Sequence, residues 1–106
     1  MKLFDFLKSP DIHQGAAEQA NTPGSLLLDV RTPEEFEQGH LPGSQNVPLD
    51  DLDKIAQVTD NRNTPLYVYC YSGARSRQAA AMLQRMGYTR VRNIGGIAAW
   101  NGRMAK

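Results

Sequence analysis

The feature that most restricts the fold of this chain is an alternation of strand-like and helix-like segments. Residues 25–30 form an unbroken, largely apolar run, as expected for a strand covered on both faces. Three further strands are expected at 44–48, 66–69 and 89–94. Helices are expected between them, at 12–20, 33–38, 52–58 and 75–86, with a short final one from residue 97. Strands that alternate with helices predict an α/β fold with a parallel sheet.

Capping and turn residues place the ends of two of these helices. Thr32 can cap the second helix, Pro33 suits its first position, and Glu35 completes a capping box, while Gly39 is placed to end it. Gly87 is placed to end the helix at 75–86. The pair Gly95-Gly96 is predicted to form a turn after the last strand.

Length and composition favour one small globular domain. The 106 residues suffice for a single core, and we expect a leader at 1–11 followed by one domain at 12–106. No apolar run approaches the ~20 residues of a membrane span. The apolar stretch at the N-terminus is short and interrupted by Asp5, which makes a poor secretory signal. These observations predict a cytoplasmic protein that does not act at a membrane.

The formal net charge of +1 hides a division of charge along the chain. Residues 1–60 carry four basic and eleven acidic side chains, a net charge of −7. Residues 61–106 carry eight basic side chains and no Asp or Glu, a net charge of +8. Such a division often points to anionic partners, although the two halves can also interleave and cancel in space. The basic residues are neither clustered nor interleaved with aromatic ones, so nucleic-acid binding is not expected.

The single thiol is the residue with the clearest chemical potential. Cys70 follows an apolar strand and precedes a polar, glycine-containing loop at 71–74 that leads into a helix. In a parallel sheet this is where sites form, and loop amides with a helix N-terminus favour a thiolate. Arg75 is placed to add a cation, with Arg77 as a second candidate. The alternative is that Cys70 is a small buried hydrophobe.

The cysteine count limits other chemistry. One cysteine excludes an internal disulfide, and with only two histidines it excludes a Cys/His zinc site of the usual ligand number. We therefore expect no metal at the site.

Three segments together resemble the rhodanese (sulfurtransferase) family. They are the loop Cys-Tyr-Ser-Gly-Ala-Arg-Ser at 70–76, the stretch 28–48 with Asp-Val-Arg-Thr-Pro-Glu-Glu-Phe and Gly-His-Leu-Pro-Gly, and Gly-Gly-Ile with Trp100 at the end. They occur in the family's order and cover most of residues 25–101. The resemblance implies a five-stranded parallel sheet flanked by helices on both faces. It also implies a persulfide intermediate on Cys70.

The resemblance assigns roles to a small set of residues. Cys70 is the expected catalytic residue, and the loop that holds substrate and persulfide comprises Tyr71, Ser72, Gly73, Ala74, Arg75 and Ser76. Three further residues match family positions as pocket or structural support: Asp29, Arg31 and Trp100. We expect Asp29 to bond loop backbone and Arg31 to pair with a carboxylate. Glu34, Glu35 and Glu37 are interpreted as a solvated helix face.

The predicted reaction is transfer of a sulfane sulfur. The Cys70 thiolate would take sulfur from a small anionic donor such as thiosulfate and pass it to cyanide or to a thiol, which could be a protein thiol. No cofactor is expected beyond the covalent persulfide. One alternative is a persulfide carrier or docking module with little free turnover. A weaker one is a phosphatase or arsenate reductase, because related enzymes of that kind have one more residue between cysteine and arginine than the four found here.

Overall fold

The protein is built around a parallel four-stranded sheet in the order β2-β1-β3-β4. The computed structural model describes residues 10–106, so residues 1–9 of the expected leader lie outside the described part. The strands are β1 (Leu26–Asp29), β2 (Gln45–Asn46), β3 (Leu66–Cys70) and β4 (Val91–Gly96). β3 lies at the centre and is buried along its whole length, between β1 and β4. The four strands predicted from the residues are therefore all present.

The helices lie where the sequence predicts them, with small shifts at their ends. They are α1 (Ile12–Ala20), α2 (Pro33–Gln38), the 3-10 helix η2 (Leu49–Lys54), α3 (Ile55–Val58), α4 (Ala74–Arg85) and the 3-10 helix η3 (Ile97–Ala99). The capping box that starts α2 is confirmed, with the Thr32 side chain accepting from the Glu35 N–H and the Glu35 carboxylate accepting from Thr32. None of the helices in residues 10–106 is long and apolar enough to cross a bilayer.

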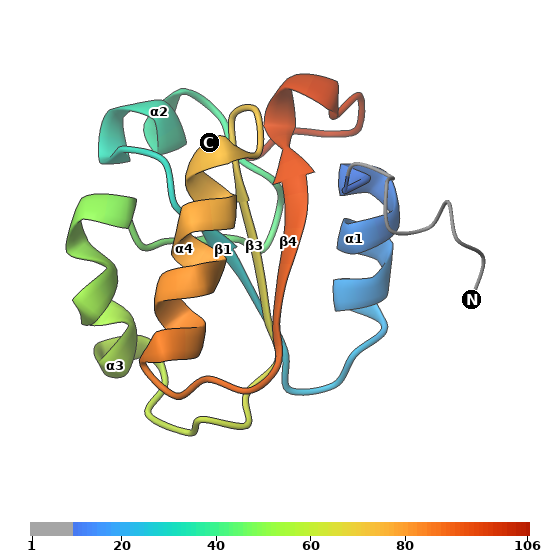
Figure 1. The fold of residues 1–106 in the computed structure, drawn as a ribbon. Helices are drawn as coiled ribbons and strands as arrows, with labels where there is room; N and C mark the ends of the chain where they lie inside the picture. Colours follow the sequence, from blue (N-terminus) through green and yellow to red (C-terminus); the bar gives the residue numbers. More distant parts are fainter. Residues whose placement is uncertain (1–9) are drawn as a thin grey trace.

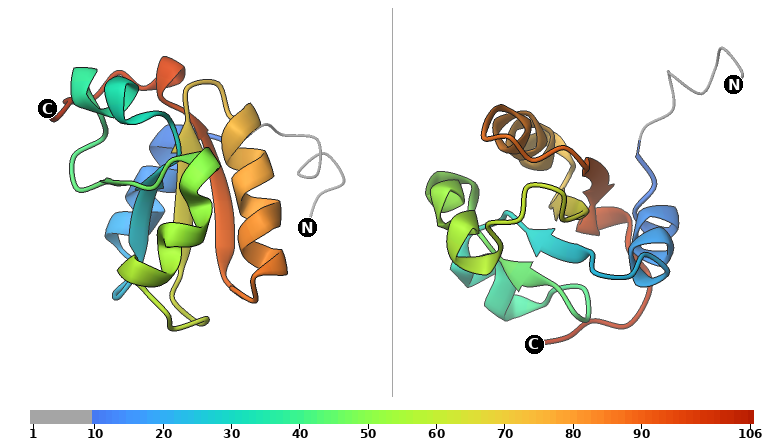
Figure 2. Two further views of the ribbon diagram at one scale, coloured as in Figure 1. Left: turned by 90° about the vertical axis from the view of Figure 1, so that its left-hand side faces the viewer. Right: turned by 90° about the horizontal axis from the view of Figure 1, so that it is seen from below.

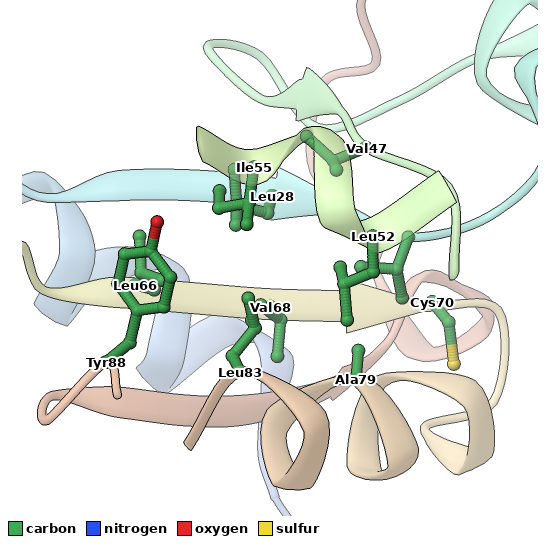
Figure 3. Close-up of a cluster of buried hydrophobic side chains, with 11 residues drawn as sticks. Leu28, Val47, Leu52, Ile55, Leu66, Val68, Cys70, Ala79, Leu83 and Tyr88 are labelled. Carbon is green, nitrogen blue, oxygen red and sulfur yellow. The ribbon is translucent and has the colours of Figure 1, made fainter. Parts of the chain in front are cut away.

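The helices cover both faces of the sheet, as predicted (Figure 1). Figure 2 shows α1 on one face and α3 with α4 on the other. Alternate residues of β3 supply the two cores: Leu66, Val68 and Cys70 face α4, while Tyr67 and Tyr69 face α1. Figure 3 shows the first of these cores, with the side chains of Val68 and Leu83 packed between the sheet and α4. Both faces of the central strand are thus fixed by apolar packing.

The sheet has four strands among the described residues, so the five implied by the family resemblance is wrong for residues 10–106. The segment before β1 is helix α1, which is capped by Asp11 and packs on the sheet face rather than at its edge. Near the C-terminus, only the isolated antiparallel bridge between His40 and Ala105 adds backbone pairing. Neither segment extends the sheet by a parallel strand.

The predicted turn at Gly95-Gly96 is also wrong, because both glycines belong to β4. Gly95 pairs with Tyr69 and Gly96 with Cys70, and the register shifts opposite Val68 and Tyr69. This bulge lets the strand continue to the level of the cysteine. A Cβ on Gly96 would lie 2.1 Å from the Tyr71 carbonyl oxygen, so glycine is required by the close approach of the two backbones.

Candidate active site

The cysteine loop lies at the carboxyl end of the sheet, beside the first turn of α4 (Figure 1). The Gly73 N–H donates to Cys70 Sγ at 2.9 Å, and the Ser76 hydroxyl lies 3.5 Å from the same sulfur. Gly73 immediately precedes the helix, and its φ of +103° is a left-handed conformation that favours glycine. The loop amides and the positive end of a 12-residue helix therefore converge on the thiol.

These contacts set the ionisation of the thiol. Burial on its own would raise the pKa of Cys70, because it disfavours the charged form. Hydrogen bonds from the Ser76 hydroxyl and from the backbone amides of Ser76, Gly73 and Ser72 outweigh burial, so the pKa lies below its ordinary value. A lowered pKa increases the fraction of thiolate, which is the nucleophilic form.

Cys70 is both a core residue and a bonded thiol. Its exposed fraction is 0%, and its side chain extends from the end of β3 toward the first turn of α4 (Figure 3). Its burial agrees with the interpretation as a small core residue, while its role as a reactive thiol stays a prediction. Because the side chain is buried, a molecule from solution can contact the sulfur only after the surrounding atoms move.

Asn93 of β4 is a site residue that the sequence reasoning did not single out. Its Oδ1 accepts from the Ser76 hydroxyl at 2.7 Å and from the Gly95 N–H at 3.0 Å, while its Nδ2 donates to the Gly73 carbonyl at 3.4 Å. One amide group thus connects the last strand, the loop and the helix. The signal in the sequence is a polar amide within a strand, two residues before the Gly-Gly pair.

Arg75 does not act as a free cation beside the sulfur. Its guanidinium makes a bidentate ion pair with the Glu35 carboxylate, with N–O distances of 2.7 and 3.0 Å. The hydrogen bonds from Arg75 are the main reason why the pKa of Glu35 is lowered from 4.5 to about 2. The interpretation of Glu35 as part of a solvated face is therefore wrong, because a residue 40 positions along the chain reaches back to it.

Arg77 is the cation that faces open space next to the loop. A hollow of about 520 Å³ lies beside the cysteine loop and includes Arg77 in its lining. The rest of the lining is mostly backbone and small side chains: Pro10, Tyr71, Ser72, Gly73, Ala74, Asn93, Gly95, Gly96, Ala98 and Ala99. Within residues 10–106, no carboxylate forms an ion pair with Arg77, whose side chain is exposed.

Asp29 and Arg31 form a buried ion pair at the end of β1. The Arg31 guanidinium donates to both Asp29 oxygens at 2.7–3.1 Å and to the Gly39 carbonyl at 2.7 Å. The Arg31 N–H also donates to Asp29 Oδ1 at 2.9 Å. The pair therefore closes the segment around α2 onto the sheet, and its atoms make no hydrogen bond to Cys70.

The closing Gly-Gly-Ile segment and Trp100 behave differently. The Ala98 N–H donates to the Tyr71 carbonyl at 3.0 Å, so η3 is hydrogen-bonded to the backbone of the cysteine loop. Trp100 instead packs with the core under α1 and stacks on His13 with 5.0 Å between ring centroids. Trp100 thus belongs to the apolar cluster on the α1 face of the sheet.

No group of three or more metal-ligating His, Cys, Asp or Glu side chains occurs among residues 10–106. The groups of the site are the Cys70 thiol, the loop amides, the Ser76 hydroxyl, the Asn93 carboxamide and two arginines in different environments.

Comparison with known proteins agrees with this geometry. The sequence model of the rhodanese-like domain matches residues 13–103. Thiosulfate sulfurtransferase PspE of Escherichia coli is 42% identical over 71 residues, which covers 66% of this chain and 68% of that protein. A sulfurtransferase of Allochromatium vinosum is 42% identical over 83 residues, which covers 76% of each chain.

A solved structure described as a rhodanese with anions from E. coli superimposes with a TM-score of 0.72. It is 37% identical and covers 77% of this chain and 98% of its own. Because the family match spans most of the sequence and includes the cysteine loop, the chain belongs to the rhodanese-like domain family.

Proposed function

We propose that this protein is a sulfurtransferase that carries a sulfane sulfur as a persulfide on Cys70. The observation that supports this most directly is the hydrogen bonding of the sulfur, by the Gly73 amide at 2.9 Å and by the Ser76 hydroxyl at 3.5 Å. Such donors stabilise an anion on the cysteine without a separate general base. The relatives named as sulfurtransferases support the same class of reaction.

The first step of the proposed reaction loads the enzyme. The Cys70 thiolate attacks the sulfane sulfur of thiosulfate, a new S–S bond forms, and the old S–S bond breaks with its electron pair leaving on sulfite. The negative charge then resides on the outer sulfur of the persulfide. In this proposal the loop amides from Tyr71 to Ser76 would stabilise that charge.

The second step of the proposed reaction removes the sulfur from the enzyme. A thiophilic acceptor, cyanide or a thiolate, attacks the outer sulfur, and the S–S bond breaks with its electron pair returning to Cys70. The acceptor leaves with the added sulfur, and the thiolate is regenerated. The two steps are separate, so the kinetics are of the ping-pong type.

Phosphate-ester chemistry fits the site less well. A phosphatase of this kind needs a loop arginine directed at the substrate oxygens. Here Arg75, the arginine that closes the loop, is bonded through both terminal nitrogens to Glu35. We expect only background hydrolysis of an aryl phosphate.

Burial of the sulfur favours one variant of the proposal, in which the acceptor is a protein thiol rather than a small molecule. A fully buried Cys70 restricts the access of solutes, and a docked partner can supply the contacts that open the loop. A carrier of this kind would transfer sulfur to its partner thiol much faster than to cyanide.

Mass spectrometry of the intact protein tests the proposal. After incubation with thiosulfate, wild type should gain one sulfur atom, which cyanide should then remove as thiocyanate. Cys70→Ser should gain none, and because Cys70 is the only cysteine, the added sulfur has no other thiol to occupy. If no sulfur is added from thiosulfate, a polysulfide or a small persulfide, the proposal is wrong.

A further inference from the structure

The Ser76 hydroxyl has more acceptors than it can serve. Ser76 is fully buried, and four acceptors lie within reach of its Oγ: Asn93 Oδ1 at 2.7 Å, the Gly73 carbonyl at 3.1 Å, the Gly95 carbonyl at 3.4 Å and Cys70 Sγ at 3.5 Å. A serine hydroxyl carries one proton. At any moment that proton therefore bonds to one main acceptor, and the others must be satisfied elsewhere.

The four acceptors differ in how much they depend on this proton. The Gly73 carbonyl also accepts from Asn93 Nδ2, and Asn93 Oδ1 also accepts from the Gly95 N–H. The sulfur is the only one of the four whose charge changes during catalysis. A thiolate attracts the proton strongly, whereas the inner sulfur of a persulfide is neutral and attracts it weakly.

We propose that Asn93 is a positioning residue for the Ser76 hydroxyl. While Cys70 carries sulfur, the hydroxyl donates its hydrogen bond to Asn93 Oδ1, and when the thiolate forms, the hydroxyl donates to the Cys70 sulfur instead. This inference rests on the proposed function. In the unloading step, the S–S electron pair moves onto Cys70 Sγ, and the Ser76 hydroxyl turns from Asn93 Oδ1 toward that sulfur. The departing thiolate thus gains a hydrogen bond that it lacks as a persulfide.

Two ion pairs and the unpaired Arg77 are the charged groups described at this end of the sheet. Arg75 of α4 is bonded to Glu35 of α2, and Asp29 of β1 is bonded to Arg31. Arg77 of α4 lines the neighbouring hollow. Neutral hydrogen-bond donors are the main groups that favour ionisation of Cys70, and Asn93 competes with the sulfur for the one donor that can rotate.

A double-mutant cycle of pH profiles tests the competition without any sulfur transfer. The rate of alkylation of the single thiol by iodoacetamide, followed against pH, reports the ionisation of Cys70. Ser76→Ala should move the midpoint to higher pH, because the thiolate loses a donor. Asn93→Ala should move it to lower pH, because the hydroxyl loses its shortest competing acceptor, and it should have no effect in the Ser76→Ala background.

The opposite result overturns the proposal. If Asn93 only supports the loop, its removal loosens the amides around the sulfur and moves the midpoint upward, equally with or without the Ser76 hydroxyl. If Asn93→Ala does not fold, the wild-type chain remains informative. The NMR signal of the Asn93 side-chain carbonyl should titrate with Cys70, and this response should disappear in Ser76→Ala; an unchanged signal in wild type would contradict the proposal.

Single-turnover kinetics separates this inference from the proposed function. With protein first loaded from thiosulfate, Ser76→Ala should slow release of sulfur to cyanide by about tenfold, the effect of a hydrogen bond to a charged group. Release is measured per loaded molecule, after the loaded fraction of wild type and variant has been determined by intact mass. Failure to load at all would reject the proposed function, whereas normal loading with unchanged release would reject the role of Ser76 and Asn93 alone.

Discussion

Two arginine–carboxylate pairs lie at the carboxyl end of the sheet, and they differ in burial and in how far apart their partners are in sequence. Asp29 and Arg31 are two residues apart, with exposed side-chain fractions of 0% and 6%. Glu35 and Arg75 are 40 residues apart, with exposed fractions of 31% and 36%. The first pair joins the end of β1 to the Gly39 carbonyl, and the second joins α2 to the cysteine loop.

The difference shows that similar ion pairs can serve structure and reactivity separately. A buried pair costs desolvation and is tolerated only when both partners stay, so Asp29 and Arg31 act as a fixed unit. A partly exposed pair contributes little to stability, but its charges remain close to the thiol. In the Glu35–Arg75 pair, the carboxylate also offsets the positive charge that Arg75 would otherwise bring to Cys70.

The largest effect on stability is expected from breaking the buried pair. Asp29→Ala leaves the Arg31 guanidinium buried without its carboxylate and should lower the free energy of unfolding by about 3–5 kcal/mol. Glu35→Gln is the matched change in the exposed pair and should cost about 1 kcal/mol or less. Urea unfolding followed by circular dichroism measures both. Equal losses in the two variants would contradict the distinction between the pairs.

The exposed pair should instead change the reactivity of the thiol. Arg75→Ala removes the cation and leaves Glu35, so the pKa of Cys70 should rise and alkylation near neutral pH should slow about two- to fivefold. Glu35→Gln leaves Arg75 unopposed and should have the opposite effect. Both effects should shrink at high salt, because the pair is partly exposed. A change in the same direction in both variants would indicate disturbed loop structure rather than charge.

The Glu35–Arg75 pair should also make the free energy of unfolding depend on pH in the acid range. The pKa of Glu35 is lowered from 4.5 to about 2 in the folded protein, chiefly by Arg75. Its contribution is therefore complete above pH 4.5 and is lost as the pH falls toward 2. The difference in unfolding free energy between wild type and Glu35→Gln should be constant above about pH 5 and approach zero near pH 2. A difference that does not depend on pH over this range would reject the assignment.

The smallest structural effect is expected at Arg77, which belongs to neither pair. Arg77→Ala should change stability by less than about 0.5 kcal/mol, since the side chain is exposed. If the hollow admits the anionic donor, KM for thiosulfate should rise about two- to fivefold while release to the acceptor is unchanged. Arg85→Ala, an exposed arginine at the far end of α4, is the control for general loss of positive charge. An equal change in KM in both variants would show that Arg77 affects thiosulfate only through long-range electrostatic attraction, and not through contact in the hollow.

Local sequence signals predicted the elements well, because each depends on neighbouring residues. The Thr32 capping box, the apolar central strand and the placement of Cys70 between a strand and a helix are local patterns, and the structure has each of them. The fifth strand was not a local signal, since it came from the family resemblance. The described chain does not contain it.

The parts of the site that were not predicted depend on contacts between distant segments. Asn93 meets Ser76 only because β4 pairs with β3 in a shifted register, and that register is invisible in either strand alone. Glu35 meets Arg75 because α2 and α4 begin at the same end of the sheet. Gly95 and Gly96 resemble a turn locally, yet both belong to β4, where Gly96 is needed to admit the Tyr71 backbone.

The residues that make hydrogen bonds to Cys70 and its loop follow Cys70 in the chain, and this order matters during biosynthesis. The Gly73, Ser76, Asn93 and Ala98 contacts all follow Cys70, and the last two require β4 and η3 to be docked. A growing or partly unfolded chain therefore displays an ordinary thiol, protonated at neutral pH and slow to react. We therefore expect the thiol to reach its full nucleophilicity only after β4 and η3 have docked, and the nascent chain to be oxidised more slowly than the folded protein.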